Sequence, residues 1–79
     1  MAKRWARVLS AADLGRFLAE LRAERGLTQA ELADELGISR RYLYEIEAGK
    51  PILYTDRLFA TLRVLGARLT IEAQVGGDE

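Results

Sequence analysis

The side chains best suited to chemistry lie close together in the middle of the sequence, where Arg40 and Arg41 are followed by Tyr42, Tyr44 and Glu45. An arginine can donate two hydrogen bonds to the O6 and N7 atoms of one guanine, and it also pairs with phosphate. Adjacent arginines in the first turn of a helix therefore indicate contact with a nucleic acid. The alternative is an amphipathic helix whose charges only keep it soluble, and the position of the arginines favours the nucleic-acid interpretation.

Catalysis is not expected from this composition. The sequence contains no cysteine, which excludes disulfides and thiolate metal sites, and no histidine, which removes the usual general base and the commonest metal ligand. It also has no glycine loop able to cradle a phosphate and no convincing cluster of carboxylates. We therefore expect no enzyme activity, no cofactor and no bound metal.

Two short helices joined by a tight turn, over residues 27–50, must position the arginines. Thr28 opens a Thr-x-x-Glu capping box at the start of the first helix, and Gly37 is placed to end that helix. Ser39 can cap the second helix, and Gly49 can end it. A helix, a turn containing glycine and a second helix of this size form the helix-turn-helix arrangement.

Residues 16–66 resemble the Xre/Cro family of helix-turn-helix repressors. The motifs that carry the resemblance are Thr-Gln-Ala-Glu-Leu-Ala at 28–33, Gly-Ile-Ser at 37–39 and Ile-Glu-Ala-Gly-Lys at 46–50. Within the family, the HipB-like antitoxins are the most similar branch, because a short extended segment follows the helical part. The resemblance implies a mainly α fold: a four- to five-helix Cro/Xre-type helix-turn-helix domain with a C-terminal β-strand pairing across a dimer.

The resemblance also implies which residues contact DNA. Base-reading positions of the family are matched by Arg40, Arg41 and Glu45. Positions that contact phosphates or bases are matched by Gln29 and Ser39, and a position that contacts the DNA backbone is matched by Lys50. Two bulky residues stand where the family usually has small ones, and we expect them to contact phosphate or thymine methyl groups: Tyr42 and Tyr44.

The N-terminal segment, residues 1–9, carries three cations and no acid: Lys3, Arg4 and Arg7. We predict a basic arm or a short strand. The sequence leaves open whether this segment contacts DNA or pairs in a sheet of the dimer. Trp5 is interpreted as a packing anchor.

Residues 10–66 are expected to form the DNA-binding domain, with one further helix on each side of the central pair. Ser10 can cap the first of these, a scaffold helix whose apolar residues recur with helical spacing. Thr55 can cap the last helix, and Gly66 is placed to end it. The apolar stripe of that last helix is typical of a core, although part of it could contact a second copy.

The segment at 67–75 has a different period, because four apolar residues alternate with polar ones: Leu69, Ile71, Ala73 and Val75. Strict alternation predicts a half-buried strand. A lone strand leaves its backbone groups unpaired, and only the N-terminal segment offers a weak partner. We therefore expect these four residues to form a dimerisation strand that pairs with a second copy, with a flexible acidic tail at 76–79.

The chain of 79 residues has a formal net charge of zero and a pI of about 6.3, whereas DNA-binding domains are usually basic. Non-specific DNA affinity should then be low, and specific binding should depend on dimerisation. A domain of this size also has a small core, which oligomerisation can supplement. No apolar run is long enough for a membrane span, and no segment has the layout of a signal peptide. We expect a cytoplasmic, nucleoid-associated bacterial protein.

The predicted function is a homodimeric, sequence-specific repressor that binds an inverted-repeat operator in double-stranded DNA. By resemblance it would be the antitoxin of a HipBA-like toxin-antitoxin module, which binds a HipA-like toxin kinase and autoregulates its operon. Two alternatives stay open: a stand-alone phage-like Xre repressor, or a helix-turn-helix adaptor that has lost DNA binding.

Overall fold

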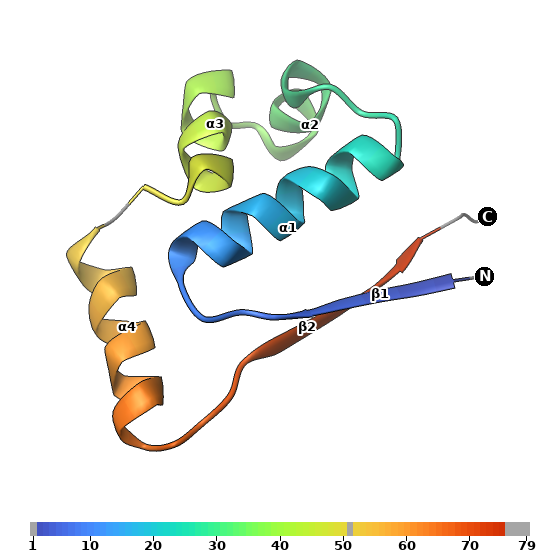
Figure 1. Cartoon of the computed structure of the whole chain (residues 1–79). Coiled ribbons are helices and arrows are strands. Elements are labelled where there is room, and N and C mark those ends of the chain that lie inside the picture. Colours follow the sequence, from blue (N-terminus) through green and yellow to red (C-terminus); the bar gives the residue numbers. More distant parts are fainter. Residues whose placement is uncertain (1, 51, 76–79) are drawn as a thin grey trace.

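The computed structural model describes residues 2–50 and 52–75. The elements follow one another as β1 (Ala2–Arg7), α1 (Ala11–Glu24), α2 (Gln29–Leu36), α3 (Arg40–Ala48), α4 (Leu53–Val64) and β2 (Thr70–Val75). Helix α1 lies between the α2–α3 pair and the two-stranded sheet, and α4 stands to one side (Figure 1). The described part of the chain is thus mainly α, as expected. None of its helices is both long and apolar enough to span a membrane.

The central helices begin and end where the sequence predicts. The Oγ1 atom of Thr28 accepts a hydrogen bond from the backbone N–H of Glu31 at 3.1 Å, and the Glu31 carboxylate accepts one from the N–H of Thr28 at 2.9 Å. Ser39 caps α3 through its hydroxyl oxygen in the same way, at 3.0 Å. Gly37 and Gly49 end the two helices in the left-handed conformation, with φ of 71° and 66°, which glycine adopts without a steric penalty.

Helix α1 and the end of α3 approach each other so closely that one contact point admits no side chain. A Cβ atom on Gly15 would stand 2.5 Å from the carbonyl oxygen of Ile46 and would also meet the backbone of Glu47. At Gly49, a Cβ atom would stand 2.7 Å from the backbone nitrogen of Ala12. These close approaches hold α3 against the scaffold helix by its C-terminal end, so its N-terminal turn projects away from the contact.

The core of the domain is small. Each helix contributes one fully buried apolar side chain, and the segment after β1 contributes another: Val8, Phe17, Ala33, Leu43 and Phe59. Leu43 of α3 is 4% exposed, whereas Ile46, one turn later on the same helix, is 37% exposed. A core of this size leaves many large apolar side chains in contact with solvent.

The strand at the C-terminal end has its partner within the same chain. β1 and β2 pair in antiparallel fashion, from Ala2 opposite Val75 to Arg7 opposite Thr70. The expectation that β2 lacks a strong partner in its own chain was therefore wrong, and the strand begins at Thr70 and not at residue 67. The open choice between an arm and a strand at the N-terminus is decided in favour of a strand.

Strand β1 was hard to recognise because a cation occupies one of its inward positions. Arg4 lies opposite Ala73 on the half-buried side of the sheet. Its guanidinium pairs with Glu20 at 2.8 Å and with Glu24, both on α1, and lies 5.5 Å from the ring centre of Phe17. Two carboxylates and an aromatic face thus make the inward position acceptable to arginine.

The other side of β1 is open to solvent. Trp5 lies there with Lys3 and Arg7, as strand alternation requires, and is 66% exposed. Its interpretation as a packing anchor was therefore wrong. The Nζ atom of Lys3 pairs with the carboxylate of Glu72 at 2.9 Å on this outer face.

Helix α4 begins three residues earlier than predicted. Its N-cap is Ile52, which makes no side-chain capping bond, and Thr55 lies inside the first turn, where its hydroxyl donates to the Ile52 carbonyl at 3.1 Å. The prediction of Thr55 as the cap was wrong. Gly66 follows the helix in the left-handed conformation, as predicted. The predicted acidic tail at 76–79 lies outside the described residues.

Candidate nucleic-acid interface

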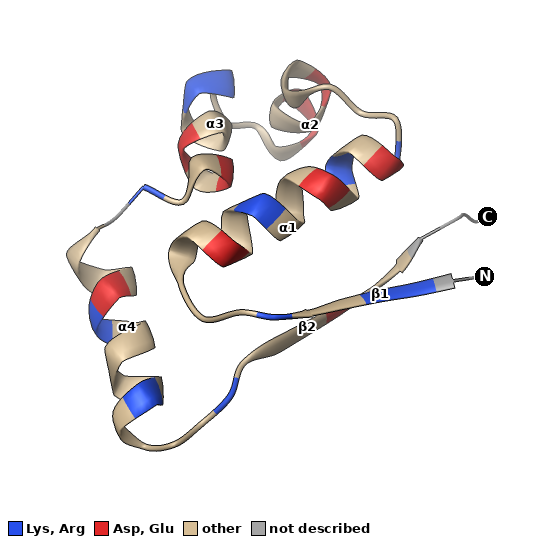
Figure 2. Cartoon of the chain, in the orientation of Figure 1, with Lys and Arg blue, Asp and Glu red and all other residues tan. Residues whose placement is uncertain are grey.

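Four of the residues predicted to contact DNA come together at the N-terminal ends of α2 and α3. Gln29, the first residue of α2, lines an open hollow of about 380 Å³ together with Arg40, Arg41 and Tyr44 of α3. The first turn of α3 is basic, and it lies at the end of the molecule away from the sheet (Figure 2). The hollow therefore combines cations, an amide and an aromatic ring on one accessible surface.

The two arginines differ in their immediate surroundings. Arg41 donates from Nε to the carboxylate of Glu45 one turn later, at 3.4 Å, and the side chain of Arg40 is exposed on the same turn. An exposed pair of this kind adds little stability. Arg41 can therefore exchange Glu45 for a base or a phosphate at small cost, and Glu45 keeps free acceptor positions of its own.

The other predicted contacts are distributed along α3 and at both of its ends. Tyr42 and Tyr44 are both more than half exposed. The hydroxyl of Ser39 accepts the capping bond, which leaves its O–H free to donate to a phosphate. Lys50 is exposed immediately after the C-cap of α3. It lies at the opposite end of the helix from the arginines, as expected for a residue that contacts only the DNA backbone.

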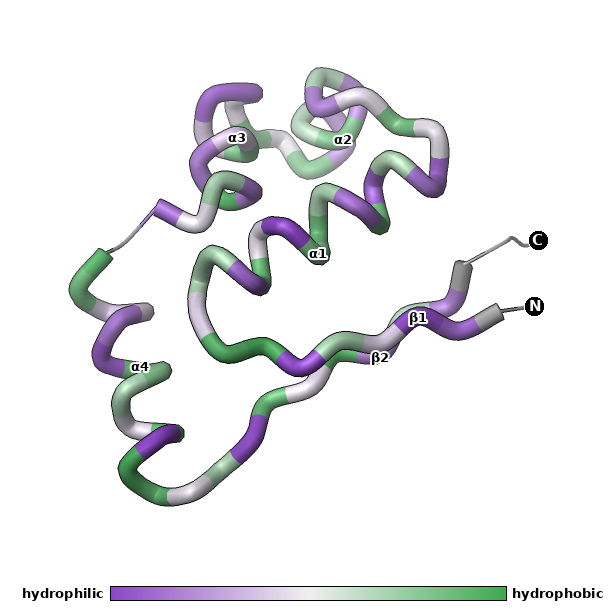
Figure 3. The backbone as a smooth tube through the Cα atoms, viewed as in Figure 1, coloured by the Kyte–Doolittle hydropathy of each residue, from purple (hydrophilic) through white to green (hydrophobic). Residues whose placement is uncertain are grey.

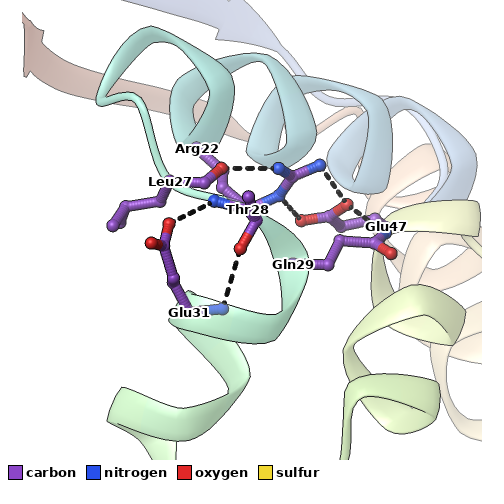
Figure 4. A network of polar contacts seen from close by, with 6 residues as sticks. All are labelled: Arg22, Leu27, Thr28, Gln29, Glu31 and Glu47. Carbon is purple, nitrogen blue, oxygen red and sulfur yellow. Dashed lines mark hydrogen bonds and ion pairs between the residues drawn. The ribbon is translucent and has the colours of Figure 1, made fainter.

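A network that the sequence did not predict connects this surface to the scaffold. The guanidinium of Arg22 on α1 makes two bonds with the carboxylate of Glu47 on α3, from Nε at 2.6 Å and from Nη2 at 3.0 Å (Figure 4). Its Nη1 also donates to the Leu27 carbonyl at 2.8 Å, and the Gln29 amide donates to Glu47 at 2.9 Å. One part-buried ion pair thus joins α1, the start of α2 and the end of α3.

The charges in this network stay fixed at neutral pH. The bonds from Arg22 hold the pKa of the Glu47 carboxyl below its ordinary value, although burial acts in the opposite direction, and the bond from Gln29 lowers it further. The same ion pair raises the pKa of the Arg22 guanidinium. Glu47 is therefore an ionised carboxylate that can only accept hydrogen bonds.

The family of the chain follows from comparison with known proteins. Residues 13–73 match the family model described as a helix-turn-helix domain. The chain belongs to the helix-turn-helix family. It is also 36% identical over 73 residues, 92% of either chain, to the uncharacterized HTH-type transcriptional regulator y4mF of Sinorhizobium fredii (strain NBRC 101917 / NGR234). No solved structure gave a significant match.

Most of the cations in the N-terminal segment of this helix-turn-helix protein form ion pairs with acids of the same chain. Lys3 pairs with an acid of β2, and Arg4 pairs with acids of α1. Arg7 lies on the outer side of the sheet. The sequence left two roles open for the N-terminal segment. Its described part does not form a flexible arm, because Ala2–Arg7 is a strand paired with β2.

The residues predicted to dimerise lie on the other side of the same sheet. Leu69, Ile71 and Ala73 are half-buried on the side that faces α1, and Val75 is paired through its backbone with Ala2. The side chains of Leu69, Ile71 and Ala73 therefore contribute to the fold of a single chain. Any contact with a second copy through this strand would use its open backbone edge.

Proposed function

We propose that this protein is a sequence-specific DNA-binding repressor of transcription, in which α3 enters the major groove. The observation that carries the proposal is the pair of exposed arginines in the first turn of α3, beside Gln29 and Tyr44 at one open hollow. In helix-turn-helix complexes the N-terminal residues of the second helix contact base edges. The capped start of α3 directs these side chains away from the scaffold.

The balance of charge requires two copies for tight binding. The chain as a whole is neutral, and a single α3 presents few cations to the phosphates. A homodimer doubles the contacts and reads two half-sites about 34–36 Å apart, one turn of DNA. The proposed operator is therefore an inverted repeat.

Two surfaces are candidates for the dimer contact, and the face of α4 is favoured over the edge of β2. Five large apolar side chains of α4 and its C-cap are between 42% and 85% exposed: Leu53, Tyr54, Leu58, Val64 and Leu65. Figure 3 shows hydrophobic positions at both ends of this helix. Thr61 on the same helix does not need a hydrogen-bond acceptor outside α4, because its hydroxyl donates to the Arg57 carbonyl at 2.7 Å.

The chain exposes more surface than a compact monomer of its mass, and the apolar side chains of α4 are part of that surface. The accessible surface is 5823 Å², whereas a compact monomer of this mass exposes about 4,800 Å². An antiparallel pair of α4 helices would remove this apolar face from water.

Leu58→Glu is expected to convert the dimer into a monomer, because it places a charge in the centre of the apolar face of α4. Sedimentation velocity measures the change. Leu36→Glu is the matched control, since Leu36 is also an exposed leucine but lies on α2. An unchanged dimer in Leu58→Glu would instead place the interface at the open backbone edge of β2.

The DNA proposal is tested by selection from random duplexes, followed by fluorescence anisotropy on the selected sequence. We expect an inverted repeat, and we expect that inserting five base pairs, about half a turn, between its halves abolishes binding. Recovery of no preferred sequence would favour the alternative of a helix-turn-helix adaptor without DNA binding.

A finer form of the proposal is that the protein is the antitoxin of a HipBA-like module, with a HipA-like toxin kinase as its partner. The extended segment after the helical part supports it, and the exposed Trp5 on the outer side of the sheet supplies an aromatic anchor of the type enriched at protein interfaces. Such a regulator would act on the nucleoid in the cytoplasm and would have no catalytic activity. Co-purification with the product of an adjacent kinase gene would distinguish an antitoxin from a stand-alone phage-like Xre repressor.

A further inference from the structure

Glu47 is the most constrained ionised group in the described part of the chain that lies near the DNA interface. Its side chain is only 6% exposed. Its Oε1 atom accepts from Arg22 Nη2 and from Gln29 Nε2, and its Oε2 atom accepts from Arg22 Nε. Glu47 thus binds Arg22 of α1 and Gln29 of the candidate interface at the same time. Glu47 itself does not line the DNA-facing hollow.

The ionisation of Glu47 determines how the Gln29 side chain is turned. A carboxylate only accepts hydrogen bonds, so the amide of Gln29 must direct its nitrogen toward Glu47. The amide carbonyl oxygen and the second N–H are then left for contacts on the outer side. Figure 4 shows Gln29 next to Glu47 at the start of α2. The half-buried Gln29 therefore presents both a donor and an acceptor beside Arg40 in one defined orientation.

We infer that Glu47 is a positioning residue for DNA recognition. Its carboxylate holds the Gln29 amide in the orientation that contacts DNA. The same carboxylate forms the ion pair with Arg22, so the orientation of Gln29 depends on that ion pair. This inference rests on the proposed DNA-binding function. It assigns to Glu47 a role beyond stability: a change at Glu47 should alter DNA binding through Gln29, even where the fold is retained.

The nearest conservative change is Glu47→Gln, which keeps the shape of the side chain but can both donate and accept. The amide of Gln29 is then free to turn either way. We expect operator affinity of the full-length dimer to fall about tenfold, as for the loss of one hydrogen bond in each of two half-sites. Gln29→Ala should cause a similar loss.

A double-mutant cycle distinguishes positioning from a general loss of stability. In the Gln29→Ala background, Glu47→Gln should cause no further loss of operator affinity, when binding is measured well below the melting temperature of each variant. The control cycle combines Glu47→Gln with Arg41→Ala, and there the losses should multiply. Multiplying losses in both cycles would overturn the inference, whereas failure of the wild-type protein to bind any selected duplex would instead refute the proposed function.

A second measurement keeps the inference testable if Glu47→Gln folds poorly. In the wild-type protein without DNA, the two side-chain N–H resonances of Gln29 should be well separated, with one protected from exchange with water. Lowering the pH until Glu47 becomes protonated should remove that protection while the backbone spectrum still reports a folded chain. Gln29 resonances like those of a solvated glutamine at neutral pH would overturn the inference.

Discussion

Replacing Glu47 by alanine is expected to lower the free energy of unfolding by about 1.5–3 kcal/mol, because the part-buried guanidinium of Arg22 loses both of its charge-assisted hydrogen bonds to Glu47. The Arg22 side chain is only 17% exposed, and the Glu47 side chain 6%. The bond from Gln29 is lost as well. Urea denaturation followed by circular dichroism measures the change, and Arg22→Ala should have a comparable effect.

Exposed Glu35 on α2 provides the control, since Glu35→Ala should change stability by less than about 0.5 kcal/mol. The pH dependence gives an independent check. Folding lowers the pKa of Glu47 below its ordinary value of 4.5, so the stabilisation is present above that value and is lost as the pH falls through the pKa of the folded state. Glu47→Gln should remove this part of the acid sensitivity. A Glu47→Ala variant as stable as the wild type would show that the ion pair does not support the fold.

Arg40→Ala and Arg41→Ala are each expected to weaken operator binding and to relax the preference at one base pair in every half-site. A bidentate contact between an arginine and a guanine discriminates by about 1–3 kcal/mol, and a dimer loses it twice. Fluorescence anisotropy on the selected operator, and on duplexes that vary one base pair at a time, measures both effects. The loss of preference matters more than the loss of affinity, because removal of a phosphate contact would weaken all sequences equally.

Arg63→Ala is the matched control for the arginine variants. Arg63 is exposed on α4, away from the hollow lined by α2 and α3, so its loss should leave base preference unchanged. Wild-type-like affinity and preference in both Arg40→Ala and Arg41→Ala would refute the assignment of α3 as the recognition helix.

The parts of the fold that could be predicted are those determined by neighbours in sequence. The capping box at Thr28, the cap at Ser39 and the glycines that end α2 and α3 act within one helical turn, and the structure confirms them. The alternation of residues 67–75 also predicted a strand there. The resemblance to the Xre/Cro family named Gln29, Arg40, Arg41 and Tyr44. These residues lie at one surface because the turn between α2 and α3 brings the starts of both helices together.

The features that could not be predicted depend on residues far apart in the chain. Arg22 and Glu47 are 25 positions apart, and no local pattern distinguishes them from other charged residues on their helices. The alternation of β1 was hard to recognise in the sequence because the charged Arg4 occupies an inward position. That position is acceptable to arginine only because Glu20, Glu24 and Phe17 surround it. For the same reason the N-terminal segment was rated as only a weak partner of β2, although it is the strand that pairs with it.

The most direct test of the central claim is a titration of the isotope-labelled protein with its selected duplex, observed by the backbone amide resonances. If α3 reads the DNA, the largest changes should lie at Gln29 and over residues 39–45, with smaller ones near Lys50 and little change on the outer side of the sheet. Changes concentrated on α4 or around Trp5, with residues 39–45 unaffected, would contradict the claim that this helix-turn-helix binds DNA through α3.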